Sequence, residues 1–403
     1  MSLKVLISGA GIGGVALAQS LRRSAIAFEV FERDAAIDSR AQGYRIRMDA
    51  DGDEALRTCL PPDLFELYQA TSSIAAAPPS AALNEKLEVI YRFPTPAAVA
   101  PTSNTHVAVN RHTLRQILLA DLEGNVHFGH AVVAAQQSDD FVRLDFVRLD
   151  FVNGTSATGD LLVAADGINS PLRRQFLPDA QIRDLGMTCI YGRAPLTPEL
   201  VSALPDVLHA GFTPILGPHR RTMGIGPFRK REPFAAAAAR IAPRVALDPI
   251  DDYMMWILVA PDADVAQAAH DPGALYQTAR QFTQDWHPAL REIIDRADAA
   301  ATFSIPIRTS ERIAPWPSSR VTFLGDAIHA MTPAGGIGAN TALRDAALLS
   351  YLLEHVGTGT ISVAQAIESY EAEMREYAFA AVERSLAGAR HLYRLTPPNS
   401  AGA

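Results

Sequence analysis

Six residues close to the N-terminus, Gly9 to Gly14, match the pattern G-x-G-x-x-G. An apolar run at 4–8 precedes them, helical spacing of apolar residues follows at 13–24, and a second strand-like run occupies 27–32. Such a βαβ unit brings a pyrophosphate close to a helix N-terminus, where backbone N–H groups favour anions. The pattern therefore predicts a Rossmann-like dinucleotide site. Its phosphate-binding residues are expected to be Gly9, Gly11, Ile12, Gly13 and Gly14.

An acidic residue at the end of the second predicted strand supports this assignment. Glu32 follows the glycines at the distance where a carboxylate accepts hydrogen bonds from the adenosine ribose. Arg33, beside it, is assigned to the same cofactor. These residues indicate a dinucleotide but leave NAD and FAD both open.

Composition excludes several other classes of protein. The 403 residues are 48% hydrophobic with a net charge of −8, and the basic residues are scattered, which disfavours nucleic acid as a partner. Cys59 and Cys189 are the two cysteines, too few for a disulfide framework, and they favour a cytoplasmic location. We expect no membrane span and no metal site, because neither a long apolar run nor a metal-ligand spacing is present.

Two further motifs each follow a predicted strand. Asp166-Gly167 comes after the apolar run 161–165, and Gly325-Asp326 comes after 320–324, shortly before a glycine-rich helix start. With the first glycine motif, in this order and spacing, they resemble the group A flavoprotein monooxygenases, the family of p-hydroxybenzoate hydroxylase and salicylate hydroxylase. The resemblance covers most of 1–60, 105–175 and 300–350.

The resemblance implies non-covalent FAD, reduction by NADH or NADPH, and oxygen insertion through a flavin C4a-hydroperoxide. Asp326 would lie at the flavin-side ribityl chain or near the phosphates, and Asp166 near the pyrophosphate and the passing nicotinamide nucleotide. Asn110-Arg111 matches the family pattern in which an arginine, here Arg111, reaches FAD. The implied substrate is an aromatic or polyketide-like small molecule, with O2 as second substrate.

The same resemblance implies an α/β fold. We expect a Rossmann-like FAD-binding domain, in two parts at 1–180 and 271–403, and an inserted antiparallel β-sheet substrate domain at 181–270. Residues 181–265 lack helical periodicity and contain Gly-Pro breaks, as in such a sheet. C-terminal helices complete the compact form of the family, which has no thioredoxin-like domain.

The helix that begins near Gly338 has a role that follows from electrostatics. A flavin that accepts hydride becomes negative at N1 and C2=O, and a helix start offers N–H donors and a positive dipole. Gly338, Ala339 and Asn340 are the candidates for this contact.

Catalytic residues are harder to identify from sequence. Arg45 and Arg47 alternate on a predicted strand, so they share a face that could meet a nicotinamide phosphate or an anionic substrate. Tyr191 and His209 are candidates for a base near a phenol. The catalytic candidates are therefore Arg45, Tyr191 and His209.

The predicted function is an NAD(P)H-dependent FAD monooxygenase that hydroxylates an aromatic or polycyclic small molecule. Baeyer–Villiger oxidation, epoxidation and N-hydroxylation would use the same motifs, and a non-enzymatic flavin-binding sensor is a further alternative. A flavin-dependent halogenase is disfavoured, because Trp256 stands alone and the chain has three lysines. The sequence does not indicate the oligomeric state.

Overall fold

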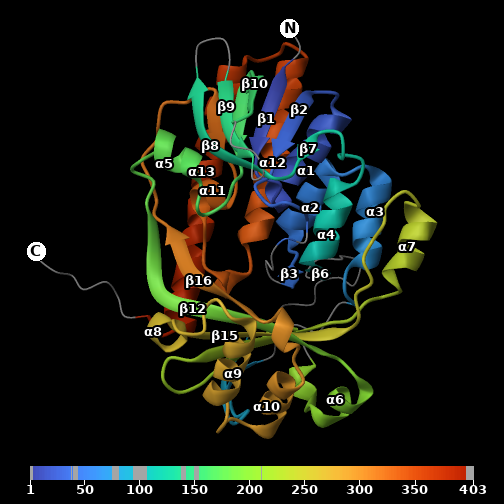
Figure 1. Cartoon of the computed structure of the whole chain (residues 1–403), viewed down its shortest axis with the longest axis vertical. Coiled ribbons are helices and arrows are strands. Elements are labelled where there is room, and N and C mark those ends of the chain that lie inside the picture. The colour runs from blue at the N-terminus through green and yellow to red at the C-terminus, as the bar shows by residue number, and fades with distance from the viewer. Residues whose placement is uncertain are drawn as a thin grey trace, which may run out of the picture.

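Five parallel strands form the sheet that carries the predicted cofactor motifs. The computed structural model describes residues 3–37, 39, 44–74, 81–93, 107–137, 142–148, 154–209 and 211–395. The strand order is β17-β11-β1-β2-β7 (Figure 1). These strands are β1 (Lys4–Ser8), β2 (Ala27–Phe31), β7 (Val126–His127), β11 (Leu161–Ala164) and β17 (Val321–Phe323). The predicted Rossmann-like sheet is thus confirmed.

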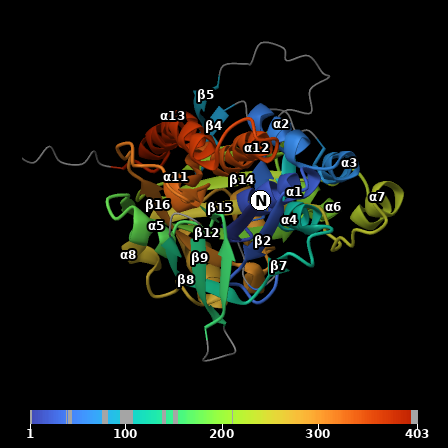
Figure 2. The ribbon, with the colours of Figure 1, turned by 90° about the horizontal axis from the view of Figure 1, so that it is seen from above.

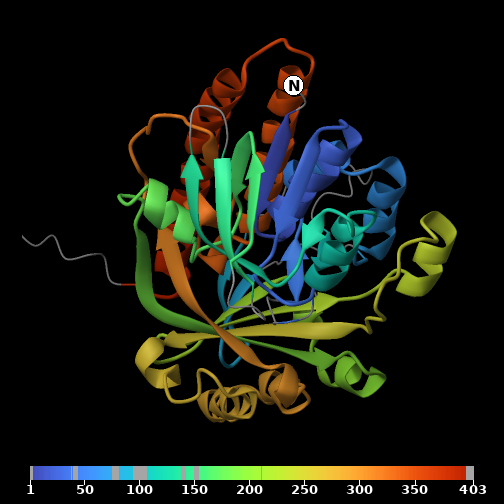
Figure 3. The same cartoon turned by 45° about the horizontal axis from the view of Figure 1, so that its top comes forward.

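Both faces of this sheet are covered, as its uninterrupted apolar strands require. Helices α1 and α12 pack together on one side, and a three-stranded antiparallel sheet crosses the other (Figure 3). The helices of this body are α1 (Ile12–Arg23), α2 (Ala50–Cys59), α3 (Pro62–Thr71), α4 (Arg111–Leu119), α5 (Pro171–Phe176), α11 (Asp326–His329), α12 (Gly338–Gly357) and α13 (Val363–Leu392). The small sheet comprises β8 (His130–Gln137), β9 (Val142–Arg148) and β10 (Ser156–Gly159).

A second, seven-stranded sheet has the order β16-β12-β15-β14-β13-β4-β5. Neighbouring strands are antiparallel except β13 and β4. The strands are β4 (Ala81–Asn84), β5 (Val89–Arg92), β12 (Ile182–Pro195), β13 (Thr213–Leu216), β14 (Thr222–Phe228), β15 (Tyr253–Pro261) and β16 (Phe303–Ser310). The sheet therefore takes β4, β5 and β16 from outside 181–270, and these domain boundaries remain a prediction.

Short helices interrupt the region that we expected to be all sheet. They are α6 (Pro198–Ala203), α7 (Phe234–Ile241) and α8 (Asp262–Val265). Helix α7 contains five consecutive alanines, which favour a helix without needing an amphipathic pattern. The expected helix at 272–297 is two helices, α9 (Pro272–Phe282) and α10 (Pro288–Asp295), because proline is suited to the first turn of a helix.

The part of the molecule built around the five-stranded sheet and the part built around the seven-stranded sheet are called the two bodies. They meet at a region that includes a two-stranded ribbon. Strand β3 (Arg45–Arg47) pairs with β6 (Ala108–Asn110) in antiparallel register. Helix α13 lies beside α12 (Figure 2), and its C-terminal end packs against the second sheet, where Thr222 donates to the Leu392 carbonyl. None of the helices in the described part of the chain has the length and apolarity to span a bilayer.

Candidate functional site

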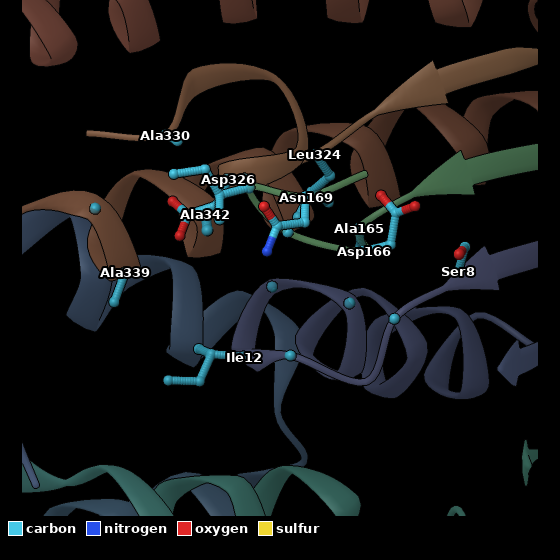
Figure 4. A pocket seen from close by; sticks show the side chains of 18 of the residues that line it. Ser8, Ile12, Ala165, Asp166, Asn169, Leu324, Asp326, Ala330, Ala339 and Ala342 are labelled. Carbon is cyan, nitrogen blue, oxygen red and sulfur yellow. The ribbon is translucent and has the colours of Figure 1, made fainter. Parts of the chain in front are cut away.

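A cavity of about 1040 Å³ lies where the two bodies meet. Its wall includes the turns after β1, β11 and β17, the start of α12, and residues of β12 and β16. The three predicted motifs, far apart in sequence, thus line one space. Figure 4 shows Asp326, Asn169 and Asp166 in a row near the start of α1, where Ile12 projects, with Ala339 on α12 beside them.

The first glycine motif forms a tight turn whose outer side is open. Gly9 has φ +108°, and a Cβ there would lie 2.3 Å from the Ala165 carbonyl oxygen, so no other residue fits without strain. A Cβ on Gly11 would meet nothing within 4 Å. No side chain caps α1, so its first N–H groups are available to an anion. Gly9, Gly11, Ile12, Gly13 and Gly14 all line the cavity.

Glu32 lines the cavity at the end of β2 and is held from two sides. Its carboxylate accepts hydrogen bonds from the Ala10 and Asp34 N–H groups at 2.9 and 3.0 Å. The Arg115 guanidinium lies 3.6 Å from it and donates to the Ala10 carbonyl at 2.9 Å. Our sequence analysis missed Arg115, although it lies one helical turn after Arg111.

Arg111 and Arg33 also line the cavity. Arg111 begins α4, directly after Asn110, whose side chain accepts the Thr113 N–H at 3.1 Å and so caps the helix. This cap fixes the point at which the chain enters α4. It brings Arg111 to the cavity from the side of the β3–β6 ribbon.

Asp166 carries an incompletely satisfied carboxylate. Neither oxygen has a hydrogen-bond partner among the described residues, and both are buried. Burial raises the pKa of this carboxyl from 3.8 to about 6. Such a group is expected where a ligand supplies the missing donors.

Asp326 faces the cavity from a turn that a buried network holds. The Asp345 carboxylate on α12 accepts the Gly325 N–H at 2.8 Å, lies 2.6 Å from His329 Nε2, and accepts the Tyr377 hydroxyl at 2.6 Å. Burial disfavours protonation of His329, but the neighbouring carboxylates outweigh it and raise the pKa of the imidazole. Desolvation by the surrounding cavity wall raises the pKa of the Asp326 carboxyl.

Two of the three residues that the sequence analysis proposed at the start of α12 line the cavity. Gly338 and Ala339 line the cavity, and no side chain caps the helix. The Asn340 side chain does not line it: its amide donates to the Arg47 carbonyl at 2.9 Å, and its oxygen accepts the Asp49 N–H at 3.1 Å. These two hydrogen bonds connect α12 to the segment that precedes α2.

The second sheet closes the cavity with apolar and aromatic side chains. Tyr191 and Cys189 project from β12, and Ile305 and Ile307 from β16. Tyr191 stacks on Phe303 with a centroid distance of 5.2 Å. Burial raises the pKa of the Tyr191 hydroxyl well above 10, so it keeps its proton at neutral pH and is a donor rather than a base.

Two predicted catalytic residues lie outside the cavity wall. His209 is bound to the Leu204 carbonyl and to Arg229, at 3.2 Å each, within the second body. These contacts explain its position without a catalytic role. Arg45 lies over the second sheet at Gly226, where a Cβ would be 2.8 Å from its Nη1.

Comparisons with known proteins identify the family of the chain. A family model described as "FAD binding domain" matches residues 2–385. The dual O-methyltransferase/FAD-dependent monooxygenase CTB3 of Cercospora beticola is 33% identical over 97% of this chain. That match covers 46% of CTB3, so the chain spans about half the length of the first curated relatives it matches.

Other relatives match over nearly their whole length. The FAD-dependent monooxygenase thnD of Trichoderma harzianum is 27% identical, over 95% of this chain and 92% of that protein. Among solved structures, a putative FAD-containing monooxygenase from Photorhabdus luminescens has a TM-score of 0.81 and 29% identity, covering 98% of both chains.

Proposed function

Because the chain belongs to the FAD binding domain family, among the group A flavin monooxygenases, we propose that it hydroxylates an aromatic or polycyclic small molecule using FAD, NAD(P)H and O2. The observation that carries the proposal is the meeting of three remote motifs and the second sheet around one cavity. When bound, FAD would supply electron transfer from NAD(P)H and the activation of O2.

The residues present fit this cofactor. The uncapped start of α1 and the open side of Gly11 would hold the pyrophosphate, with Arg33 and Arg111 as neighbouring cations. Glu32 would accept the ribose hydroxyls, Asp326 would hold the ribityl side, and ligand donors would satisfy the Asp166 oxygens. The uncapped start of α12 at Gly338 and Ala339 would face the ring where negative charge develops.

The second sheet would provide the substrate side. The apolar side chains of Ile305 and Ile307 line the cavity and would reduce the access of water to the reacting groups. The protonated Tyr191 hydroxyl would orient a substrate oxygen by donating to it. We propose that this sheet is the substrate-binding part of the molecule, while His209 is not retained as a base.

The test is product formation by the purified protein. NADH or NADPH consumption is measured with a panel of phenols and polyketides, and products are analysed by mass and NMR. A ring hydroxyl supports hydroxylation, and an inserted ester oxygen or an epoxide identifies the alternative reactions. Protein that binds FAD but never consumes NAD(P)H favours a sensor, and protein that never binds FAD contradicts the proposal.

A further inference from the structure

The three-stranded sheet contains a tandem repeat that the proposed function does not use. The sequence FVRLD occurs twice without a gap, at 141–145 and 146–150. Strand β9 begins in the first copy and ends in the second, and it lies between β8 and β10 (Figure 1). A repeated strand can move by one repeat without changing the residue type at any paired position. Strand β9 therefore has two candidate registers, one for each copy.

The structure shows the register in which the first copy pairs with both neighbouring strands. On β10, Ser156 is opposite Asp145, the last residue of that copy. Among the described residues the second copy pairs only with β8, where Arg148 is opposite His130. Between Asp145 and Ser156 the chain therefore has all of 146–155, which is longer than a hairpin connection requires.

A β-bulge lies where the two copies meet. Asp145 ends the first copy opposite Ala134, and Phe146 begins the second copy opposite Val132. Val133 is the extra residue between them, and it is exposed and lines the cavity. A bulge changes the register of an antiparallel pair by one residue. The two copies are thus paired with β8 in different registers.

Moving β9 by five residues puts the second copy in the place of the first. Residues 147–150 would then occupy the positions of 142–145, with the same residue type at each. The connection to β10 would become the three residues 152–154, Val-Asn-Gly. A three-residue hairpin loop usually ends in the left-handed conformation, which favours glycine. Gly154 is therefore at the position that such a loop requires.

Gains and losses nearly balance between the two registers. The shift lengthens the β8–β9 connection, which is 138–141 in the structure, by the five residues that it removes from the β9–β10 connection. Loop-closure entropy depends weakly on length, so this exchange has a small cost. The shifted strand would lose its pairs with His130 and Ala131, because 152–154 would form the turn, and it would gain that tight turn.

The register affects the wall of the cavity. His130 and Ala131 line the cavity, and the register of the structure is the one that pairs both with β9. The His130 N–H also donates to the Glu32 carbonyl at 2.7 Å, which connects this end of β8 to the predicted ribose contact. A ligand shifts an equilibrium toward the conformation that it binds more tightly. FAD should therefore favour the register that supports this wall.

We propose that β9 exchanges between two registers five residues apart, one for each copy of FVRLD, and that bound FAD favours the register of the structure. The second part rests on the proposed function, because it requires FAD in the cavity. The first part requires only the repeat and the sheet.

Disulfide trapping distinguishes the two registers. Thr158 is exposed on β10 opposite Arg143, and the shift would put Arg148 in that place. Directly opposite residues have Cα atoms about 4.5–5.5 Å apart, within the range for a disulfide, whereas residues two places further along are about 8 Å apart. The full chain carrying Thr158→Cys is therefore combined with one second substitution at a time: Arg143→Cys, Arg148→Cys or, as control, Phe146→Cys.

Each double variant is oxidised with diamide, with and without FAD, and the crosslinked peptides are quantified by mass spectrometry. Without FAD, the 143–158 and 148–158 crosslinks should each form at least about 10-fold faster than the control. Excess FAD should slow the 148–158 crosslink at least about three-fold without slowing the 143–158 crosslink. Gly154→Val, which disfavours the left-handed conformation, should slow the 148–158 crosslink alone. The native cysteines do not compete, because both are buried.

A chain with a single copy supplies a matched control. Deleting 141–145 or 146–150 gives the same protein, because the two copies are identical. That protein has one register, so its 143–158 crosslink should form at a rate that FAD does not change. It should still bind FAD, since the cavity-lining strand β8 is intact.

The remaining outcomes overturn the proposal. A 148–158 crosslink no faster than the control shows a single register, and a 148–158 rate that FAD does not change removes the cofactor from the exchange. An FAD-dependent rate in the single-copy chain assigns the effect to general loosening of the sheet. The pairs 144–157 and 149–157 repeat the test if a variant at 158 does not fold. Failure of the wild type to bind FAD concerns the proposed function, and the test without FAD still decides the two registers.

Discussion

Single residues in the cavity wall show how far the sequence determines the site. The positions of Gly9 and Glu32 in the cavity wall were predictable, because a dinucleotide-binding turn requires a glycine and an acidic residue at a fixed spacing. Arg115 was not, because an arginine within a helix is usually a surface charge, and only the fold brings it to Glu32. The side-chain contacts of Asn340 also depend on tertiary structure, since Arg47 and Asp49 are remote in sequence.

Asp166 provides a prediction at this scale. Its pKa of about 6 in the folded protein, against 3.8 ordinarily, means that the folded state holds this proton more tightly than the unfolded state. Stability of the cofactor-free protein should therefore fall as pH rises from about 4 to above 6. Asp166→Asn should raise the unfolding free energy by about 1–3 kcal/mol at pH 8, because it removes a buried carboxylate that is ionised there, and by little near pH 4.

Denaturant titrations of the cofactor-free protein at both pH values would measure this effect. Asp179→Asn, an exposed position after α5, is the control and should change neither value. Equal stabilities of the wild type and Asp166→Asn at pH 8 would show that the Asp166 carboxylate is not destabilised by burial.

At the scale of elements, Asp345 fastens four parts of the fold together. From α12 it bonds the turn after β17, His329 of α11 and Tyr377 of α13, and it is completely buried. Asp345→Asn breaks a buried ion pair and should cost about 3–5 kcal/mol. Tyr377→Phe removes one hydrogen bond and should cost about 1–2 kcal/mol. Urea unfolding would measure both, and equal losses would contradict the central position of Asp345.

Helix α12 supplies a second prediction at this scale. Under the proposed contact between the start of α12 and the flavin, Ala339→Asp puts a carboxylate near the developing negative charge, so the two-electron midpoint should fall by roughly 7–40 mV. Thr360→Asp, exposed beyond the other end of the helix, is the control. Both variants would be titrated anaerobically with reference dyes at full FAD occupancy. An unchanged or raised midpoint in Ala339→Asp would mean that this helix start does not address the flavin.

Strands were predicted correctly from the sequence where the spacing of apolar residues and the turn residues indicate the same element. The strands at 4–8 and 161–165 are short apolar runs before glycine turns, and the structure confirms both. Strands β4, β5 and β16 join the second sheet from remote segments, and strand pairing between such segments leaves no local pattern in the sequence.

At the scale of the whole molecule, FAD should stabilise the fold, because its proposed site is built from segments that are far apart in the sequence. The cavity wall takes residues from β1, β12 and α12, so FAD would bind the folded chain and not the unfolded one. FAD at 100 times its Kd should add about 2.7 kcal/mol, which for a protein of this size raises Tm by about 3 °C. Calorimetry with and without FAD would measure the shift, and an unchanged Tm with FAD in large excess would contradict FAD binding to the folded chain.

The proposed oxygen transfer is tested most directly with isotopically labelled O2. The experiment incubates FAD-loaded protein under ¹⁸O2 with NADH or NADPH and the panel of aromatic compounds. The masses of the products are then measured by mass spectrometry. We predict a product that carries one labelled oxygen atom, formed with consumption of NAD(P)H. If the label appears only in peroxide or water with every compound, or if oxygenated product is unlabelled, the chain does not transfer oxygen from O2 to these substrates.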